Sequence, residues 1–395
     1  EISCSLVGSE MCIRDSYNIA LAFQRTAQTQ HYAETSKDFT FQAKNTRPEK
    51  NREVYVMVIG ETSRAANWSI YGYNRNTNPE LTKIKGLTAF SHVLTESNTT
   101  HKSVPMLMSS VTAHDFNSIY RQKGIITAFK EAGYRTAFFS NQRYNHSFID
   151  FFGKEADICD FIKEDTGDGG YNPSDDELLK LVAAELAENV SKQFIVLHTY
   201  GSHFNYRERY PADNAFFLPD FPVDAELKYK DNLINAYDNS IRYTDNFLAR
   251  LIRMLQEQDI DAAMLYTSDH GEDIFDDDRH LFLHASPVPS YYQIHVPFLI
   301  WMSDNYRKNY PDLFKNAEIN RQKNISSSAS FFQTMLELGG IDTPSRNDSL
   351  SVINASYTEK NRVYLNDHNE ARSLNDIGMR EEDFTMLQMK GIVYR

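Results

Sequence analysis

The 395-residue chain has little cysteine, no long apolar run and no excess of positive charge. Cys4 and Cys12 lie in an N-terminal stretch that we exclude below, so Cys159 has no partner for an intrachain disulfide. Beyond that stretch, no segment reaches the about 18 apolar residues of a membrane-spanning helix. A net charge of −13 argues against a nucleic-acid partner.

The N-terminal residues do not read like the rest of the chain. Residues 6–16 resemble a translated sequencing adaptor, so we interpret residues 1–16 as an adaptor or cloning scar. Residues 17–52 are mostly polar and lack strong periodicity, which favours a linker that leads into the domain. Residues 53–395 are expected to form one large domain.

Apolar runs and helical patterns alternate along this domain, which predicts an α/β fold with a mostly parallel central sheet. Pro297 lies near the start of the last apolar run and predicts an edge strand or an irregular entry. The expected strands are 54–60, 134–140, 194–197, 262–266 and 295–301, and the expected helices are 124–133, 175–189, 230–258 and 326–338.

Polar strings follow three of the apolar runs directly. Glu61 follows the first, His198 to His203 follow the third, and Asp269-His270 follow the fourth. Parallel strands bring such residues to one edge of a sheet, where α/β proteins bind their ligands. Carboxylates and imidazoles are ligands that zinc prefers. Each string alone has an ordinary structural explanation as a cap or a polar core residue, but together they favour a metal site.

A hydroxyl-rich segment supplies candidate nucleophiles. Thr99 and Thr100 precede Val104 to Met108, which could open a helix because Pro105 suits a first helical turn. A hydroxyl near a helix N-terminus is well placed for a phosphate group. Coordination to zinc would lower the pKa of such a hydroxyl. An ordinary N-cap cluster is the competing explanation.

The ordered motifs together resemble a known family over about residues 52–305. They are similar to the catalytic domain of bacterial phosphoethanolamine transferases, in the sulfatase-like branch of the alkaline phosphatase superfamily, which includes lipid A-modifying colistin-resistance enzymes. The matching segments are 58–64, 71–79, Thr100 with Ser103-Val104-Pro105, 197–203, 236–239, 266–272 and Leu283-His284.

The resemblance implies a three-layer αβα sandwich and assigns roles to individual residues. Zinc ligands would be Glu61, Thr100, Asp269 and His270, with Thr100 as the nucleophile, because it keeps the family spacing to Ser103. Substrate phosphate or a second zinc would be held by His203 and His284. As catalytic residues, His203, His284 and His198 would hold the phosphoryl oxygens or supply the leaving-group proton. Apart from the resemblance, Lys102 and Asn141 are also expected at the substrate site, although Lys102 could equally be a solvated surface residue.

The implied reaction is ping-pong transfer of phosphoethanolamine from phosphatidylethanolamine to lipid A phosphate or a glycan hydroxyl. The implied location is the periplasmic face of the inner membrane. By the same resemblance, residues 53–395 would be the zinc-dependent catalytic domain, and residues 17–52 would link it to an N-terminal membrane domain that is missing from this sequence. Glu96 and Met106 stand where many lipid A-modifying members have cysteine, which leaves the acceptor open. A sulfatase would need a C/S-x-P-x-R string, and none lies near Thr100. A phosphoglycerol transferase, a phosphatase or phosphodiesterase, and an inactive binding module remain as alternatives.

Overall fold

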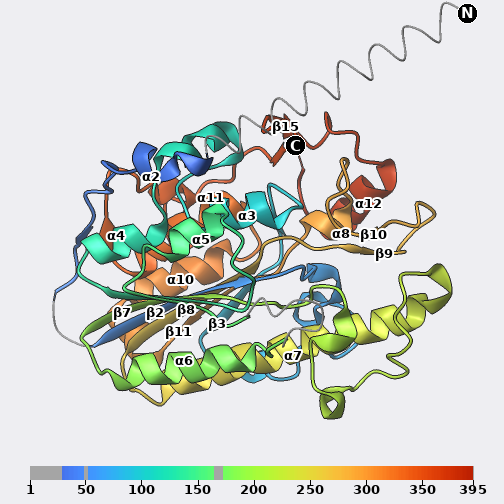
Figure 1. Ribbon diagram of the computed structural model, residues 1–395, viewed down its shortest axis with the longest axis horizontal. Helices are drawn as coiled ribbons and strands as arrows, with labels where there is room; N and C mark the ends of the chain where they lie inside the picture. Colours follow the sequence, from blue (N-terminus) through green and yellow to red (C-terminus); the bar gives the residue numbers. More distant parts are fainter. Residues whose placement is uncertain (1–28, 49–51, 164–171, 395) are drawn as a thin grey trace, which may run out of the picture.

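A seven-stranded sheet runs through the middle of the molecule in the computed structural model, which describes residues 29–48, 52–163 and 172–394 (Figure 1). The strand order is β3-β11-β8-β2-β7-β5-β6. The strands are β2 (Glu53–Gly60), β3 (Leu87–Phe90), β5 (Arg135–Ser140), β6 (Ile158–Phe161), β7 (Lys192–His198), β8 (Asp261–Ser268) and β11 (Phe298–Met302).

The sheet is mostly parallel, as predicted. Within the described part of this sheet only β11 runs against its neighbours, pairing antiparallel with both β3 and β8. Of the two alternatives expected for Pro297, the edge strand is wrong and the irregular entry is confirmed, because residues 296–297 lie outside any strand between the bridge at His295 and β11. Pro297 stands just before β11, so it removes no ladder hydrogen bond, and its carbonyl accepts a hydrogen bond of 2.8 Å from the Thr267 hydroxyl.

Helices cover both faces of the sheet, which gives the expected three-layer αβα arrangement (Figure 1). Side chains of β2 alternate between the two cores: Tyr55 and Met57 enter one, and Val56 and Val58 enter the other. One layer contains α3 (Thr100–Leu107), α4 (Ile125–Glu131), α5 (Phe148–Gly153), α10 (Pro311–Asn320) and α11 (Ser327–Leu338), and the opposite layer contains α6 (Asp176–Ala187) and α7 (Lys230–Gln256).

The predicted helices form within a few residues of their expected bounds. Gly133, with φ of +86°, follows α4 and reverses the chain into β5, a conformation that favours glycine. Shorter elements surround the sheet: β4 (Val93–Leu94), β9 (Asp273–Ile274), β10 (Phe282–Leu283), α8 (Tyr291–Ile294), α9 (Asp304–Asn309), β12 (Ile325–Ser326), β14 (Val363–Leu365), β15 (Ala371–Ser373) and α12 (Glu381–Met389).

The described part of the expected linker, residues 29–48, packs against the domain. Here α2 (Tyr32–Thr35) packs against α5, and β1 (Lys44–Asn45) pairs with β13 (Ile341–Asp342). Phe41 is buried in the main core beside Phe332. The segment is mostly polar, so its composition did not indicate that a few apolar residues are buried in the core. Residues 1–28, including the stretch read as an adaptor, lie outside the described residues.

We expect Phe41→Ala to lower the free energy of unfolding by about 3 kcal/mol, because the substitution leaves a cavity in a closely packed core. Urea unfolding would measure the change. Lys44→Ala, at an exposed position of the same segment, is the control and should cost less than about 0.5 kcal/mol. Equal, small effects would show that the segment does not belong to the folded core.

Candidate active site

The carboxyl ends of three neighbouring strands form one edge of the site. In the parallel register Gly60 on β2 lies opposite Ser268 on β8, and Ile59 lies opposite His198 on β7. The next residues, Glu61 and Asp269, therefore leave the sheet at the same level. The sequence prediction that these strand ends meet is confirmed.

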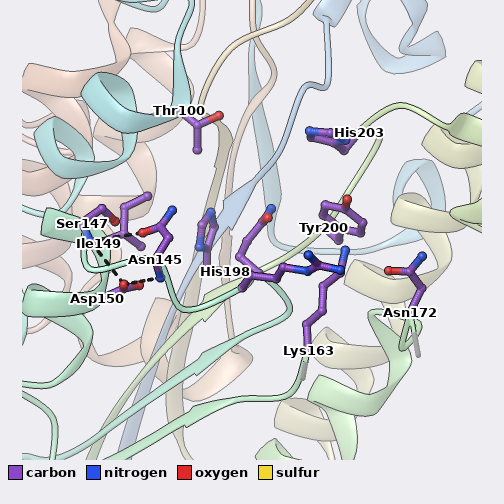
Figure 2. A pocket seen from close by; sticks show the side chains of 12 residues that line it. Thr100, Asn145, Ser147, Ile149, Asp150, Lys163, Asn172, His198, Tyr200 and His203 are labelled. Atoms are coloured by element: carbon purple, nitrogen blue, oxygen red, sulfur yellow. Dashed lines mark hydrogen bonds between the residues drawn. The ribbon is translucent and has the colours of Figure 1, made fainter. Parts of the chain in front are cut away.

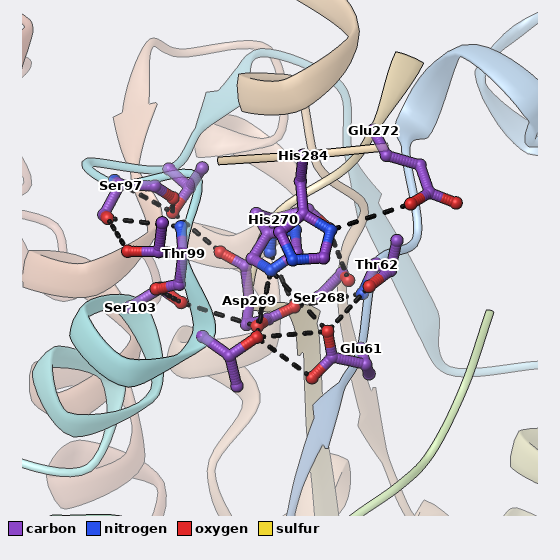
Figure 3. A network of polar contacts seen from close by, with 12 residues as sticks. Glu61, Thr62, Ser97, Thr99, Ser103, Ser268, Asp269, His270, Glu272 and His284 are labelled. Atoms are coloured by element: carbon purple, nitrogen blue, oxygen red, sulfur yellow. Dashed lines mark hydrogen bonds and ion pairs between the residues drawn. The ribbon is translucent and has the colours of Figure 1, made fainter. Parts of the chain in front are cut away.

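Glu61, Asp269 and His270 form a compact buried cluster (Figure 3). One ligand atom from each lies within 4.8 Å of the others. Thr100 joins them from α3, because its Oγ1 lies 3.0 Å from His270 Nε2 and 3.1 Å from Glu61 Oε1. The structure thus brings together all four residues that the sequence nominated as metal ligands.

Burial makes this cluster costly without a positive ion. Glu61 and Asp269 are each at most 1% exposed. Loss of hydration raises the pKa of Glu61 well above its ordinary value, with the Asp269 charge adding to the effect, and raises the pKa of Asp269 to about 6. Burial lowers the pKa of His270. Two carboxylates that resist ionisation beside a neutral imidazole are the expected electrostatics of a divalent-metal site.

The orientation of His270 also fits a metal ligand. Its Nδ1 lies 2.9 Å from the carbonyl oxygen of Gly271, which suits an N–H donor at Nδ1. Nε2 then carries the lone pair and faces Glu61, Asp269 and Thr100. Histidines that bind metals commonly fix their second nitrogen in this way. The residues present therefore fit a zinc ion.

Thr100, rather than Thr99, faces the cluster. Thr99 Oγ1 lies 3.2 Å from Ser97 Oγ, on the other side of the loop (Figure 3). Helix α3 begins at Thr100, four residues earlier than the sequence suggested, so Pro105 lies inside the helix instead of opening it. Thr100 is consequently the first helical residue, next to the free N–H groups of the first turn.

A second group of imidazoles lies beside the cluster. The rings of His270 and His284 are 4.2 Å apart, and those of His284 and His203 are 6.3 Å apart. His284 Nδ1 lies 3.7 Å from Glu272 Oε2, and both carboxylate oxygens of Glu272 are buried without a hydrogen-bond partner. These residues could hold phosphate oxygens or, with Glu272, a second cation.

A cavity of about 370 Å³ opens beside Thr100 (Figure 2). His198 and His203 line it, and burial lowers their pKa to about 3 and about 4, so both imidazoles are neutral at pH 7. His198 Nε2 is buried without a partner. Such an orphaned nitrogen next to a cavity suits a ligand contact, in line with the predicted role.

Two predicted substrate contacts do not reach this cavity. Lys102 Nζ donates to the Asn366 carbonyl at 2.8 Å, and Lys102 is not among the residues that line the cavity. Asn141 Nδ2 donates to Asp175 Oδ1, also at 2.8 Å. Asp175 in turn accepts hydrogen bonds from the backbone of Tyr200 and Gly201. Asn141 therefore supports the loop that carries His203, and direct substrate contact by either residue stays a prediction.

Gly201 lets that loop approach Glu61 closely. A Cβ atom at this position would lie 2.7 Å from the Glu61 carbonyl oxygen, and its φ of +50° favours glycine. Ser202 N donates to the same carbonyl at 3.0 Å. The contact ties the loop after β7 to the residue that supplies a metal ligand.

Sequence reasoning missed several residues of the site. Gln142 Nε2 lies 3.4 Å from Glu61 Oε2, and Arg143, Lys163 and Tyr200 line the cavity. The available signal was their position in or beside long loops that follow strands, since such loops often carry function. No motif marked them individually, because a lone Lys or Tyr in a loop is usually a solvated surface residue.

Glu96 forms hydrogen bonds that hold the segment leading to Thr100 in place. Its Oε2 accepts a hydrogen bond of 3.2 Å from Ala113 N, and its backbone carbonyl accepts one of 2.7 Å from Leu365 N. Burial raises the pKa of the carboxyl to about 7. The side chain thus ties the loop before α3 to a neighbouring turn, at a position where the resembling family led us to expect cysteine.

We expect Glu96→Gln to flatten the pH dependence of stability. Because the folded-state pKa is raised from 4.5 to about 7, the folded state holds the proton more tightly, and this contribution is complete below about pH 4.5 and lost as the pH rises towards 7. Urea unfolding at pH 4.5 and pH 7.5 should show a loss about 1 to 3 kcal/mol smaller in the variant than in the wild type. Equal losses in both proteins would contradict the assignment.

Known proteins match this chain in sequence over most of its length. The family model described as Sulfatase matches residues 53–341. The Kdo(2)-lipid A phosphoethanolamine 7''-transferase of Escherichia coli K12 is 31% identical over 296 residues, which cover 73% of this chain and 51% of that protein. The chain spans about half the length of the curated relatives it matches.

Solved structures agree on the fold. The C-terminal periplasmic domain of EcEptC from Escherichia coli, in complex with Zn, has a TM-score of 0.76 at 23% identity and covers 84% of this chain and 95% of that one. The integral membrane lipooligosaccharide phosphoethanolamine transferase A of Neisseria meningitidis has a TM-score of 0.71 at 24% identity, covering 84% and 64%. Within the described residues, no helix of this chain is long and apolar enough to cross a membrane.

Proposed function

The chain belongs to the sulfatase family, and we propose that it is a transferase. The proposed reaction moves phosphoethanolamine from phosphatidylethanolamine to a cell-envelope acceptor, either a lipid A phosphate or a glycan hydroxyl. The observation that carries this proposal is the position of Thr100 Oγ1 against Glu61 and His270 at the mouth of the cavity. The names of the relatives, which are phosphoethanolamine transferases, support the choice of the transferred group.

In the first half of the reaction, Thr100 Oγ attacks the phosphorus of the donor, and the bond from phosphorus to the diacylglycerol oxygen breaks. The Thr100 proton is lost and the diacylglycerol oxygen gains one, so the step leaves a phosphoethanolamine ester on Thr100. A zinc ion held by Glu61, Thr100, Asp269 and His270 would lower the pKa of the hydroxyl and offset charge on the phosphoryl oxygens.

His203 and His284 are assigned to the phosphoryl oxygens and to proton transfer. The His284 ring lies 4.2 Å from the His270 ring, and the His203 ring lies 6.3 Å from that of His284. His203, neutral at pH 7, can take up the proton that Thr100 loses and pass it to the leaving oxygen.

In the second half, an oxygen of the acceptor attacks the same phosphorus and the bond to Thr100 Oγ breaks. Any proton on the attacking oxygen passes to Thr100, so the enzyme returns to its starting state. We place the reaction at the periplasmic face of the inner membrane, with membrane attachment through an N-terminal domain. The match to a relative that is an integral membrane protein supports the membrane location.

Donor selectivity tests the proposal. The protein loaded with zinc is incubated with labelled phosphatidylethanolamine or labelled phosphatidylglycerol in mixed micelles, and release of diacylglycerol is measured. We expect release from phosphatidylethanolamine at a rate at least about tenfold higher. Preference for phosphatidylglycerol would establish a phosphoglycerol transferase instead, and no release from either lipid would overturn lipid head-group transfer.

A further inference from the structure

Three cationic side chains gather around Tyr200, on the side of the cavity away from the metal cluster. Lys163 Nζ lies 3.5 Å from the centre of the Tyr200 ring, and the Arg209 guanidinium carbon lies 4.0 Å from it. Arg143 lines the same cavity. Figure 2 shows Lys163 reaching up to Tyr200, with His198 and Thr100 across the cavity. In a chain of net charge −13, this local positive charge calls for an explanation.

Lys163 lacks a direct anionic partner among the described residues, and only the more distant charges of Glu208 and Asp175 favour its ammonium form. Lys163 is only 7% exposed, and no described residue forms an ion pair or a hydrogen bond with its ammonium group. Arg209, by contrast, donates to Glu208 and to the Asn205 carbonyl. A nearly buried ammonium group without an anionic partner is costly, and a bound anion would remove that cost.

The proposed function gives the phosphate of the donor other partners. Phosphatidylethanolamine has one phosphate, which the proposed function places at Thr100 with His203 and His284. Its ammonium group would be repelled by Lys163 and Arg143. The second substrate, the acceptor, is therefore the molecule whose charge the cavity can match.

Resting on the proposed function, we propose that Lys163 and Arg143, with the orphaned Nε2 of His198, form an anion subsite that anchors a phosphate or carboxylate group of the acceptor. The acceptor class is thus an anionic glycolipid or sugar, and a neutral glycan is a poor substrate. The anchored anion positions the acceptor oxygen that attacks the phosphoethanolamine ester on Thr100.

The neighbouring polar groups leave room for this role. Asp150 also lines the cavity, but its carboxylate accepts hydrogen bonds from Asn145 N at 2.7 Å and Ser147 N at 3.3 Å, at the start of α5. The stacked rings of Tyr200 and His203, 5.0 Å apart, link the cation cluster to the phosphoryl site. An anion beside Lys163 would consequently lie in the same cavity as the nucleophile.

The test compares Lys163→Ala with the wild type in the two half-reactions. Diacylglycerol release from phosphatidylethanolamine reports the first. Transfer to N-acylglucosamine 1-phosphate, to the matching uronate and to the neutral methyl glycoside reports the second. In Lys163→Ala we expect the KM for at least one anionic acceptor to rise about tenfold to a hundredfold. This fold-change should be at least about tenfold larger than any fold-change in the rate of diacylglycerol release.

Two further variants complete the test. Lys163→Arg should recover most of the affinity for the anionic acceptor, because it restores the positive charge. Lys154→Ala is the matched control, since Lys154 also lies over a tyrosine ring, at 4.1 Å from Tyr144, but is exposed and outside the cavity. Its kinetics should match the wild type.

The outcomes separate this inference from the function beneath it. If the KM rises for the phosphate acceptor alone, or for the uronate acceptor alone, that result identifies the anion that the subsite holds. Equal KM changes for the neutral and anionic acceptors, or no change for any, would overturn the anion subsite. If the wild type releases no diacylglycerol at all, it is the proposed function that fails.

Discussion

Replacing Thr100 with alanine is expected to reduce phosphoethanolamine transfer by about ten-thousandfold or more, because the reaction loses its nucleophile. Metal binding should weaken only in part, since Glu61, Asp269 and His270 remain in place. Steady-state transfer assays and metal analysis of the purified variant would measure the two effects. Loss of activity with retained metal would separate the chemical role of Thr100 from a role as ligand alone.

The neighbouring hydroxyl provides the matched control. Thr99→Ala removes a hydroxyl one residue away that faces Ser97 and not the cluster, so its activity should stay within about tenfold of the wild type. Thr100→Ser keeps the hydroxyl and should retain measurable transfer. If Thr99→Ala is the inactive variant and Thr100→Ala is active, the nucleophile has been assigned to the wrong residue.

Removal of the metal is expected to abolish transfer and to lower the melting temperature. The free carboxylates of Glu61 and Asp269 would then face each other in a buried site, whereas zinc at a thousandfold excess over its Kd adds about 4 kcal/mol of stability. Thermal unfolding and activity, measured after chelation and again after addition of Zn²⁺, would test this. Full recovery with zinc is the expected result.

Glu61→Gln gives a genetic counterpart to chelation. The amide preserves the shape of the side chain but removes its charge, so we expect the bound zinc to fall below one equivalent and the transfer rate to fall by about 100-fold or more. Gln142→Ala alters a neighbour of Glu61 without removing a ligand and should keep its zinc. Equal activity and melting temperature in the chelated and loaded protein would contradict a metal-dependent site.

Much of the fold and the metal cluster could be predicted from local sequence patterns. Strand β2 is buried on both faces, so its residues form a continuous apolar run, and the polar residue that ends the run is Glu61. Asp269 follows β8 in the same way. The patterns therefore predicted that both carboxylates lie at one edge of the sheet, and the parallel pairing of β2 with β8 makes them neighbours there.

The errors have a common physical cause, which is that tertiary contacts outweigh local composition. Phe41 anchors a segment that is otherwise polar, and β11 is internal although Pro297 precedes it. Lys102 lies two residues from Thr100, but helix geometry turns it towards Asn366 and away from the cavity. Lys163 lines the cavity because it comes just after β6, and β6 is a strand that the sequence patterns did not predict.

The covalent intermediate is the central claim, and intact-mass measurement tests it most directly. The zinc-loaded protein is mixed with phosphatidylethanolamine without acceptor, quenched in acid and weighed, with fragmentation to locate the adduct. We predict a gain of one phosphoethanolamine group on Thr100 that is absent from Thr100→Ala. An adduct that persists in Thr100→Ala, or a glycerol-phosphate adduct formed from phosphatidylglycerol in its place, would contradict the account.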